Sequence, residues 1–260
     1  SIRRQRQMCI RDRLNLQYEL LAGLPVEASF SDGYAHDGKA LRANLKADRL
    51  YVVDRGHIDY RLFQEIRDAG SSFLARGREN LVARPLESRP LSPQARQAGV
   101  LSDEIVELGS APHAHKLRQP LRRIQARVKV PPSHNLNPRG RKADAGRARL
   151  AREIEMTLFT DRLDLPPEDL LQLYQYRWQI EIFFRWLKCT LGCKHLVAES
   201  ENGIQLLIYA ALIASLLIVL YARRKPNKAL LEMLQYFLLG WAGEEEVLAC
   251  IESLAPARAS

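Results

Sequence analysis

The segment Tyr174–Lys188, with the sequence YQYRWQIEIFFRWLK, limits the possible folds more than any other part of the chain. Its fifteen residues include no Gly or Pro, and the pattern predicts a helix. At about 100° per residue, four polar residues share a stripe only about 60° wide: Tyr174, Arg177, Glu181 and Lys188. Apolar side chains cover nearly all the remaining circumference. A helix of this kind has to bury most of its surface, so we expect it within a sizeable core.

The single carboxylate in this cationic stripe, Glu181, has two interpretations. A charged stripe is most often a solvated face, and Arg177 and Arg185 each lie four residues from Glu181, the spacing of ordinary helical ion pairs. In the other interpretation, the stripe is a functional site that binds a charged partner. The helix alone does not decide between the two, so the rest of the chain has to.

Positive charge is concentrated between residues 111 and 152. This segment holds twelve Lys or Arg residues and one acid, Asp144, and carries +11 in a chain of formal net charge +9. Such a block suits a polyanion, most often nucleic acid, because basic side chains release counterions when they bind phosphates. A solvated basic loop is the alternative. The apolar fraction of 47% argues against a disordered chain.

The N-terminal part alternates between strand and helix patterns. Residues 14–31 predict two strands joined by a turn, followed by a helix with Asp37 at its N-cap. A short buried strand then ends at Asp54, a helix is closed by Gly70, and residues 71–77 predict a further strand. This order predicts a mixed α/β sheet.

The middle of the chain follows a different pattern. From residue 78 to residue 152 prolines are frequent and strand-like pieces such as IQARVKV are short, so we expect an irregular β-rich insertion. Strand character returns in EIEMTLFT, before the helix that carries Glu181. The last third of the chain is predicted to be helical.

The stretch 204–221, IQLLIYAALIASLLIVLY, is close in length to a membrane span. Its basic rear flank, ARRK, fits the positive-inside rule. However, Gln205 and Ser215 interrupt the stretch, and a helix at the centre of a large core has the same composition. The stretch therefore favours a buried helix, with a membrane span as the alternative.

Two carboxylates are candidates for chemistry. Asp54 directly follows the apolar run YVV, and the carboxyl end of a buried strand is where α/β sheets usually carry function. A turn-forming aspartate is the alternative. With Glu181 it would supply the hard oxygen ligands that Mg²⁺ prefers. Two such ions activate the attacking oxygen and stabilise the leaving oxygen in phosphodiester displacement. Arg177 and Lys188 would then hold the nucleic-acid backbone.

One aromatic residue, Tyr174, lies within the same stripe, and another, Trp178, lies at its edge. The Tyr174 hydroxyl can bond a phosphate, or its ring can pack on an unstacked base. Trp178 can stack on a displaced base, although packing inside the protein is the more ordinary role. We include both residues among the candidate nucleic-acid contacts.

The spacing Tyr174-x2-Arg177-x3-Glu181-x6-Lys188 resembles the Y-R-E-K signature of insertion-sequence transposases with a DDE catalytic domain, the IS-four-like family. The segment VVDRGHIDY is similar to the second-aspartate motif of that family. The segment AGLPVEASFSDGYAHD resembles its hairpin and the turn that follows. The likeness extends over roughly residues 15–220.

The resemblance implies a ribonuclease-H-like core with a β-rich insertion before the helix that carries Glu181. It implies cut-and-paste DNA transposition that uses Mg²⁺ (or Mn²⁺), with Asp54 and Glu181 as catalytic metal ligands. It also implies that Tyr174, Arg177 and Lys188 contact the DNA of the transposon ends. The expected partners are transposon-end and target DNA and a second copy of the chain, without a membrane, in a prokaryotic cytoplasm at the nucleoid.

One part of the family pattern is not matched. The first aspartate of the family lies on a core strand upstream of the hairpin, and no strand pattern precedes Leu14. We therefore expect the first strand to be missing and the chain as given to be an inactive fragment. A non-catalytic nucleic-acid-binding relative of a transposase is the alternative.

The expected organisation has five parts. Residues 1–13 are expected to be an assembly artefact or disordered. The other parts are the first half of the core (14–77), the basic β-rich insertion (78–152), the second half of the core with the Glu181 helix (153–222), and C-terminal helices (223–260).

Overall fold

The computed structural model describes residues 12–32, 37–55, 59–77, 81–108, 119–130, 152–190, 200–222 and 228–253. The chain divides into two compact units. The sheet unit comprises Leu41–Gln175, and the hairpin unit comprises Ser1–Ala40 together with Tyr176–Ser260.

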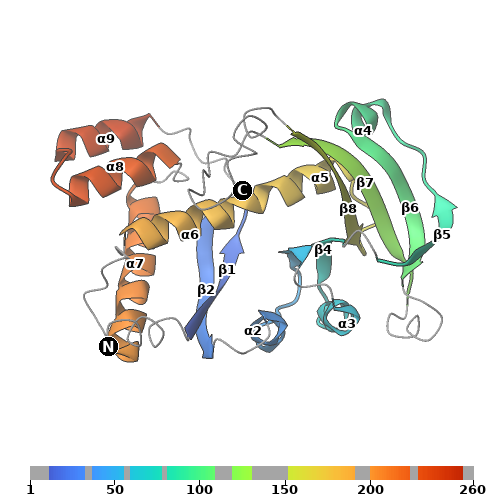
Figure 1. The fold of residues 1–260 in the computed structure, drawn as a ribbon, viewed down its shortest axis with the longest axis horizontal. Coiled ribbons are helices and arrows are strands. Elements are labelled where there is room, and N and C mark those ends of the chain that lie inside the picture. The colour runs from blue at the N-terminus through green and yellow to red at the C-terminus, as the bar shows by residue number, and fades with distance from the viewer. Residues whose placement is uncertain are drawn as a thin grey trace, which may run out of the picture. The chain divides into compact units, whose positions relative to one another are not determined.

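A six-stranded mixed sheet forms the centre of the sheet unit (Figure 1). Its strands, in chain order, are β3 (Leu50–Val53), β4 (Ser72–Arg76), β5 (Ala83–Ser88), β6 (Val100–Leu108), β7 (Leu121–Val130) and β8 (Arg152–Thr160). They are arranged in the order β3-β4-β8-β7-β6-β5. The pair β3–β4 is parallel and every other neighbouring pair is antiparallel. The predicted mixed α/β class is therefore confirmed.

The parallel pair β3–β4 is joined by α3 (Tyr60–Asp68), because parallel neighbours need a crossover connection. As the sequence predicts, Gly70 closes the helix just beyond its C-cap, with a φ of 72° that glycine adopts readily. The amide of Gly70 donates to the Arg67 carbonyl and that of Ser71 donates to the Ile66 carbonyl. These two bonds form a Schellman motif, which satisfies the last carbonyls of the helix.

The start of α3 is capped by Asp59, whose side chain accepts a hydrogen bond from the backbone amide of Arg61. The Arg42 side chain also donates to this carboxylate. Burial alone would raise the pKa of Asp59, but the hydrogen bonds from Arg42 and Arg61 outweigh it and lower the pKa. The first turn is thus stabilised by a charged cap.

Helices cover both faces of the sheet. On one face, α4 (Pro93–Gln97) and α5 (Pro167–Tyr176) pack through Ala95, Leu170 and Leu171 against residues of β4, β6, β7 and β8. On the other face, α3 packs through Leu62, Phe63 and Ile66, with the Phe63 ring stacked on Phe73 at 4.1 Å between centroids. Each such buried side chain contributes about 1.5–3 kcal/mol. Burial on both faces therefore fixes the sheet.

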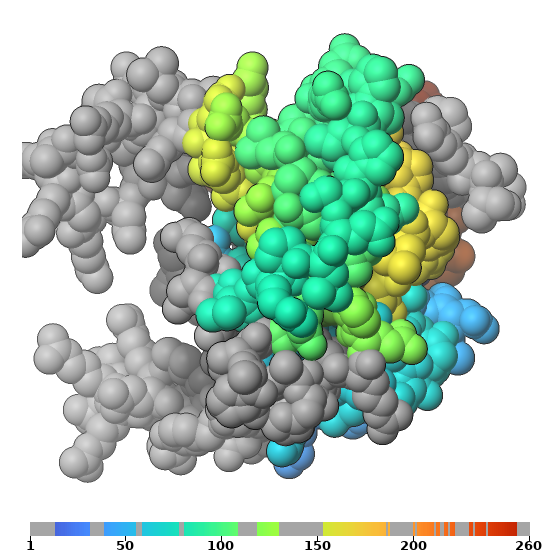
Figure 2. Space-filling view, turned by 90° about the vertical axis from the view of Figure 1, so that its right-hand side faces the viewer, coloured from blue at the N-terminus to red at the C-terminus, as the bar shows by residue number. Residues whose placement is uncertain are grey.

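The region 78–152 is more regular than expected. Strands β6 and β7 are nine and ten residues long and belong to the same sheet as β3, β4 and β8. The prolines that suggested irregularity do not interrupt the central strands: Pro85 lies on β5, the edge strand, where a missing amide is tolerated. Figure 2 shows β5 and β6 (green) on the face toward the viewer, and most β5 residues are exposed.

The described part of the basic block is largely neutralised by carboxylates. Three of its cations lie on β7 and form ion pairs across the sheet: Arg122 with Asp103, Arg123 with Glu104, and Arg127 with Glu155. These three arginines therefore have carboxylate partners within the sheet. Residues 131–151, which carry many of the other cations, lie outside the described residues.

The hairpin unit contains the predicted pair of strands, β1 (Asp12–Glu19) and β2 (Leu24–Asp32), which are antiparallel. Its helices are α6 (Trp178–Thr190), α7 (Glu201–Ala222), α8 (Lys228–Leu238) and α9 (Glu244–Glu252), and α2 (Asp37–Ala43) begins here. The hairpin packs on α6 and α7 around Phe183, Leu187 and Leu212. Tyr18 lies 5.4 Å from the Phe183 ring, and burial raises the pKa of Tyr18 to about 12.

Helix α7 contains the long apolar stretch 204–221. Of the helices in the described residues, none is long and apolar enough to cross a membrane. One side of α7 packs in the core through Ile208 and Leu212. Another side carries exposed side chains, with Leu206 71% and Leu217 58% exposed. The stretch is thus a core helix along one side only.

The long helix predicted across Tyr174–Lys188 is two helices. Helix α5 ends at Tyr176 and α6 begins at Trp178, with Arg177 in a turn between them. The prediction of one continuous helix is therefore wrong. Local helix propensity does not predict a break at Arg177, because no Gly or Pro lies there. Tyr174 consequently belongs to a different helix from Glu181 and Lys188, and the four polar residues do not form one helical stripe.

The buried ion pair on β6 and β7 is predicted to be a major determinant of stability. Arg122 and Asp103 are 1% and 3% exposed, and the guanidinium donates to both carboxylate oxygens at 2.8 and 2.7 Å. Removing the negative charge by Asp103→Asn leaves the arginine uncompensated and should lower the free energy of unfolding by about 3–5 kcal/mol. Urea denaturation measures this change.

Glu107→Gln is the matched control for that experiment, because it lies on the same strand and breaks an exposed ion pair with Arg84. It should lower stability by less than about 1 kcal/mol. Equal effects of the two substitutions would contradict the account of the buried pair.

Candidate functional site

Asp54 directly follows the last residue of β3, as the sequence predicts. Val53 beside it is 7% exposed and packs in the core that faces α3, which anchors the end of the strand. The Asp54 side chain itself is partly exposed. Because β3 and β4 are parallel, the residues that follow these two strands lie at the same edge of the sheet. This edge is where a functional group on such a sheet is expected.

The Asp54 carboxylate accepts a hydrogen bond from Tyr174. The phenol hydroxyl donates to Oδ1 at 3.0 Å, between residues 120 positions apart in the sequence. Tyr174 is 4% exposed and lies on the buried face of α5 with Leu170 and Leu171. The hydroxyl is therefore presented to Asp54 by a helix packed on the sheet, and does not lie on an open surface.

Glu181 and Arg177 form a second pair, in the hairpin unit. Glu181 lies in the first turn of α6, and Arg177 donates from Nη2 to its Oε1 at 2.8 Å. The side chains of Arg177 and Glu181 are 16% and 39% exposed. Trp178, the first residue of α6, is 51% exposed. Lys188 also lies on α6, but its side chain is outside the described residues.

The six predicted site residues thus fall into two groups. Asp54 and Tyr174 are together in the sheet unit, and Arg177, Trp178, Glu181 and Lys188 follow in the hairpin unit. Among the described residues, no three His, Cys, Asp or Glu side chains are clustered as metal ligands would be. The Arg177–Glu181 ion pair, which is expected if the charged residues simply form a solvated face, is present.

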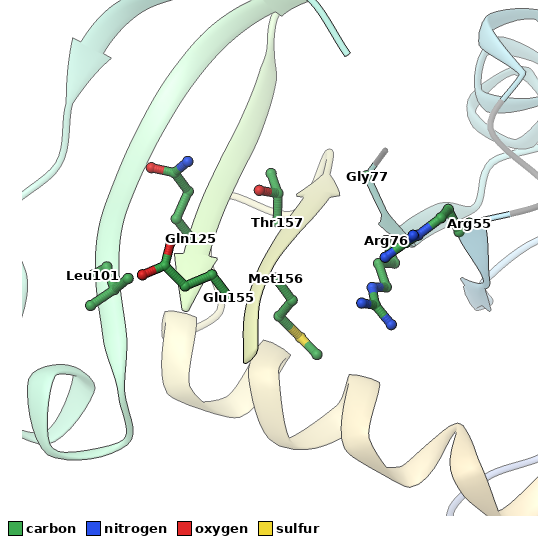
Figure 3. Close-up of a pocket in the computed structure, with 8 residues that line it drawn as sticks. All are labelled: Arg55, Arg76, Gly77, Leu101, Gln125, Glu155, Met156 and Thr157. Carbon is green, nitrogen blue, oxygen red and sulfur yellow. The ribbon is translucent and has the colours of Figure 1, made fainter. Parts of the chain in front are cut away.

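A pocket of about 200 Å³ lies in the sheet unit beside the end of β4 (Figure 3). Two cations, Arg55 and Arg76, lie on one side of it in this view, and Gln125 and Glu155 lie on the other. Its remaining lining residues are Gly77, Leu101, Met156 and Thr157. Arg76 makes no ion pair with any residue that the structure describes.

Gly77 allows the chain to leave β4 close to β8. A Cβ at this position would lie 2.5 Å from the ring of Phe159, a contact that requires something to move. The Gly77 amide donates to the carbonyl of Thr157 at 2.7 Å, so the backbone at Gly77 lies close to β8. Arg76, the preceding residue, is thereby held at the rim of the pocket.

Arg55 and Arg76 were not predicted as site residues. Each follows or ends one of the two parallel strands, Arg55 one residue beyond Asp54 and Arg76 at the end of β4. The pairing of β3 with β4 brings both to one edge, and that pairing is not apparent from either segment alone. A cation at or just beyond the end of each apolar run, in YVVDR and SFLAR, was the available signal.

A family model described as a transposase DDE domain matches residues 3–217, most of the chain. The chain belongs to this DDE transposase family. The predicted family is therefore confirmed, on residues that include the Asp54 strand and the Glu181 helix.

Individual relatives agree with this assignment. The y4zB protein of Sinorhizobium fredii, which is named as a transposase, is 24% identical over 252 residues, or 95% of this chain and 64% of the relative. A protein of Geobacillus stearothermophilus named for insertion sequence element IS5377 is 23% identical, over 79% of this chain and 48% of its own. A Synechocystis protein named for element IS4SA is 34% identical over 70 residues, 26% of this chain and 21% of its own. The DDE chain thus spans between about half and two thirds of the length of the first two relatives.

The donor chemistry of Asp54 and Glu181 fits a divalent metal ion. Both are carboxylates, which are the hard oxygen ligands that Mg²⁺ and Mn²⁺ bind. Both side chains are partly exposed, and each is oriented by a hydrogen bond from a neighbouring side chain. Such outer hydrogen bonds are typical of carboxylates that ligate metals.

Proposed function

We propose that this chain is the catalytic domain of an insertion-sequence transposase that cleaves DNA and transfers the cut strand. The observation that carries the proposal is the hydrogen-bonded Asp54 carboxylate at the end of β3, within a segment that matches the DDE family. In this proposal β3, α3, β4 and α6 belong to a ribonuclease-H-like core. Strands β5, β6 and β7 are its β-rich insertion.

Asp54 and Glu181 are the proposed metal ligands, with Mg²⁺ or Mn²⁺ as the ion. A metal bound there would activate the attacking oxygen and stabilise the charge that develops on the leaving oxygen in phosphodiester cleavage. The contribution of the chain is to hold the two carboxylates in place. Tyr174 does this for Asp54 and Arg177 does it for Glu181.

DNA binding in this proposal depends on cations near the carboxylates. Arg177 directly precedes the helix of Glu181, and Lys188 lies on that helix. We retain Trp178, which is half exposed, as a candidate for stacking on a base. Arg55 and Arg76 add two positive charges beside Asp54 at the pocket rim. Arginine suits this position because its planar guanidinium binds phosphate in a bidentate manner.

The active complex is expected to contain two copies of the chain, because two transposon ends have to be brought together. The proposed partners are the transposon ends and a target duplex.

The alternative function, non-catalytic nucleic-acid binding through the basic insertion, gains no support from the described residues. The three β7 arginines of that block are paired with carboxylates. Such a protein would also make no use of Asp54 and Glu181 as metal ligands. Loss of cutting with retained DNA affinity after substitution of Glu181 distinguishes the two functions.

Glu181→Gln is predicted to abolish DNA cutting, because an amide is a poor ligand for Mg²⁺. We expect at least a ~100-fold loss, since loss of a ligand should exceed the 10–100-fold cost of losing an outer hydrogen bond. The assay is cleavage of a plasmid that carries the gene with its own flanking DNA, by protein from the full reading frame, with Mg²⁺ or Mn²⁺. Chelation of the metal should have the same effect.

Glu245→Gln is the control, because Glu245, like Glu181, lies in the first turn of its helix, here α9. It should cut as well as the parent. DNA affinity should persist in Glu181→Gln. A Glu181→Gln protein that cuts at the parental rate would refute the catalytic assignment.

Arg76→Gln is predicted to weaken binding to duplex DNA and to reduce its salt dependence. The loss of one phosphate contact should lower the slope of log affinity against log salt by about one. Arg84→Gln removes a cation that is already paired with Glu107 on the outer strands and should change the slope little. Fluorescence anisotropy across a salt series measures both slopes. Identical slopes for the parent and Arg76→Gln would exclude a phosphate contact at Arg76.

A further inference from the structure

The contacts of Tyr174 suggest a role other than the DNA contact that the family resemblance implies. We propose that Tyr174 is a positioning residue, whose buried hydroxyl holds the Asp54 carboxylate in the orientation that binds a divalent metal ion. The inference rests on the proposed function, in which Asp54 is a metal ligand. The resemblance to the transposase family, by contrast, implies that this tyrosine contacts DNA.

The first support is the hydrogen bond itself. Tyr174 donates to Asp54 Oδ1 at 3.0 Å from a side chain that is only 4% exposed. A buried hydroxyl needs a partner, because leaving it unsatisfied is costly. A carboxylate is a stronger acceptor than a neutral oxygen. The hydrogen bond to Asp54 therefore meets the requirement of the phenol and restrains the carboxylate at once.

The second support is the rigidity of the donor. Tyr174 lies on the same face of α5 as Leu170 and Leu171, which are 0% and 2% exposed. All three pack in one cluster with Leu74 of β4 and Leu158 of β8. The ring is thus fixed by a packed core on several sides, so its hydroxyl is held in one place before any ligand binds.

The third support is the acceptor capacity of a carboxylate. An ionised carboxylate has two oxygens and about four acceptor positions. The hydrogen bond from Tyr174 uses one of these positions, at Oδ1, and the Asp54 side chain is partly exposed. Outer hydrogen bonds of this kind typically change metal affinity or activity by about 10–100-fold when they are removed.

Burial also separates Tyr174 from a surface role. Tyr176, two residues further along α5, is 38% exposed, whereas Tyr174 is 4% exposed. A phosphate group would have to displace the Asp54 hydrogen bond to reach the buried hydroxyl. Two negatively charged acceptors, the phosphate and the carboxylate, would then compete for one donor. The geometry favours the carboxylate.

The test measures binding of Mn²⁺ alone, without DNA, to the chain of residues 1–260. Electron paramagnetic resonance detects the free ion during a titration, so the readout does not depend on activity. Tyr174→Phe keeps the packed ring and removes only the hydroxyl. We expect this variant to bind Mn²⁺ about 10-fold more weakly than the parent. Tyr176→Phe, the matched control on the same helix, should bind like the parent.

Asp54→Asn separates failure of the inference from failure of the proposed function. Loss of Mn²⁺ binding in Asp54→Asn with parental binding in Tyr174→Phe would overturn the positioning role and leave the metal assignment intact. Parental binding in Asp54→Asn would overturn the metal assignment and the inference with it. Circular dichroism melting of each variant shows whether the fold is kept.

A spectroscopic measurement covers the case in which Tyr174→Phe does not fold. 3-Fluorotyrosine incorporated at position 174 reports the surroundings of the hydroxyl through its ¹⁹F chemical shift. Saturation with Mg²⁺ should move this resonance, because the metal and the phenol share the Asp54 carboxylate. The same label at position 176 should not respond. A resonance at position 174 that ignores Mg²⁺ would overturn the proposal.

Discussion

The packing of α5 on the six-stranded sheet is the interaction on which the candidate site depends. Leu170 and Leu171 fix the helix against β4, β7 and β8, and this contact carries Tyr174 to the end of β3. That helix also places the Tyr174 hydroxyl where it donates to Asp54. The candidate site is therefore assembled by hydrophobic burial, the largest favourable term in folding, together with a hydrogen bond that orients a carboxylate.

Charge in the sheet unit is divided between structure and function. The β7 arginines are matched by carboxylates on β6 and β8, and the pair Arg122–Asp103 is fully buried. Arg76, at the end of β4, has no such partner among the described residues. A count of basic residues along the chain does not separate arginines that are paired with carboxylates from arginines that are not. The position of an arginine in the sheet, and not the number of basic residues near it in the sequence, distinguishes a structural arginine from a candidate DNA contact.

Much of the fold could be predicted from local patterns, and the errors have identifiable causes. The βαβ unit around Asp54 was predictable because Gly70 ends α3 in a conformation that glycine adopts readily. The break at Arg177 was missed because no residue in that segment disfavours a helix, and tertiary packing overrode the local propensity. The regularity of β6 and β7 was missed because prolines were counted without knowledge of which strand lies at the edge.

The sequence suggested candidate site residues but not their contacts. Asp54 was proposed because it follows an apolar run, and Tyr174 and Glu181 because of their spacing. The Tyr174–Asp54 hydrogen bond joins positions 120 residues apart and leaves no local pattern. Arg76 lies beside Asp54 only because β3 and β4 pair in parallel. Contacts of this kind arise from the topology, which short motifs do not encode.

The most direct test of the metal assignment is anomalous diffraction from crystals of this chain soaked in Mn²⁺. The account predicts an anomalous peak coordinated by the carboxylates of Asp54 and Glu181, with Tyr174 still hydrogen-bonded to Asp54. A peak held by other side chains, with Asp54 and Glu181 both left uncoordinated, would contradict it.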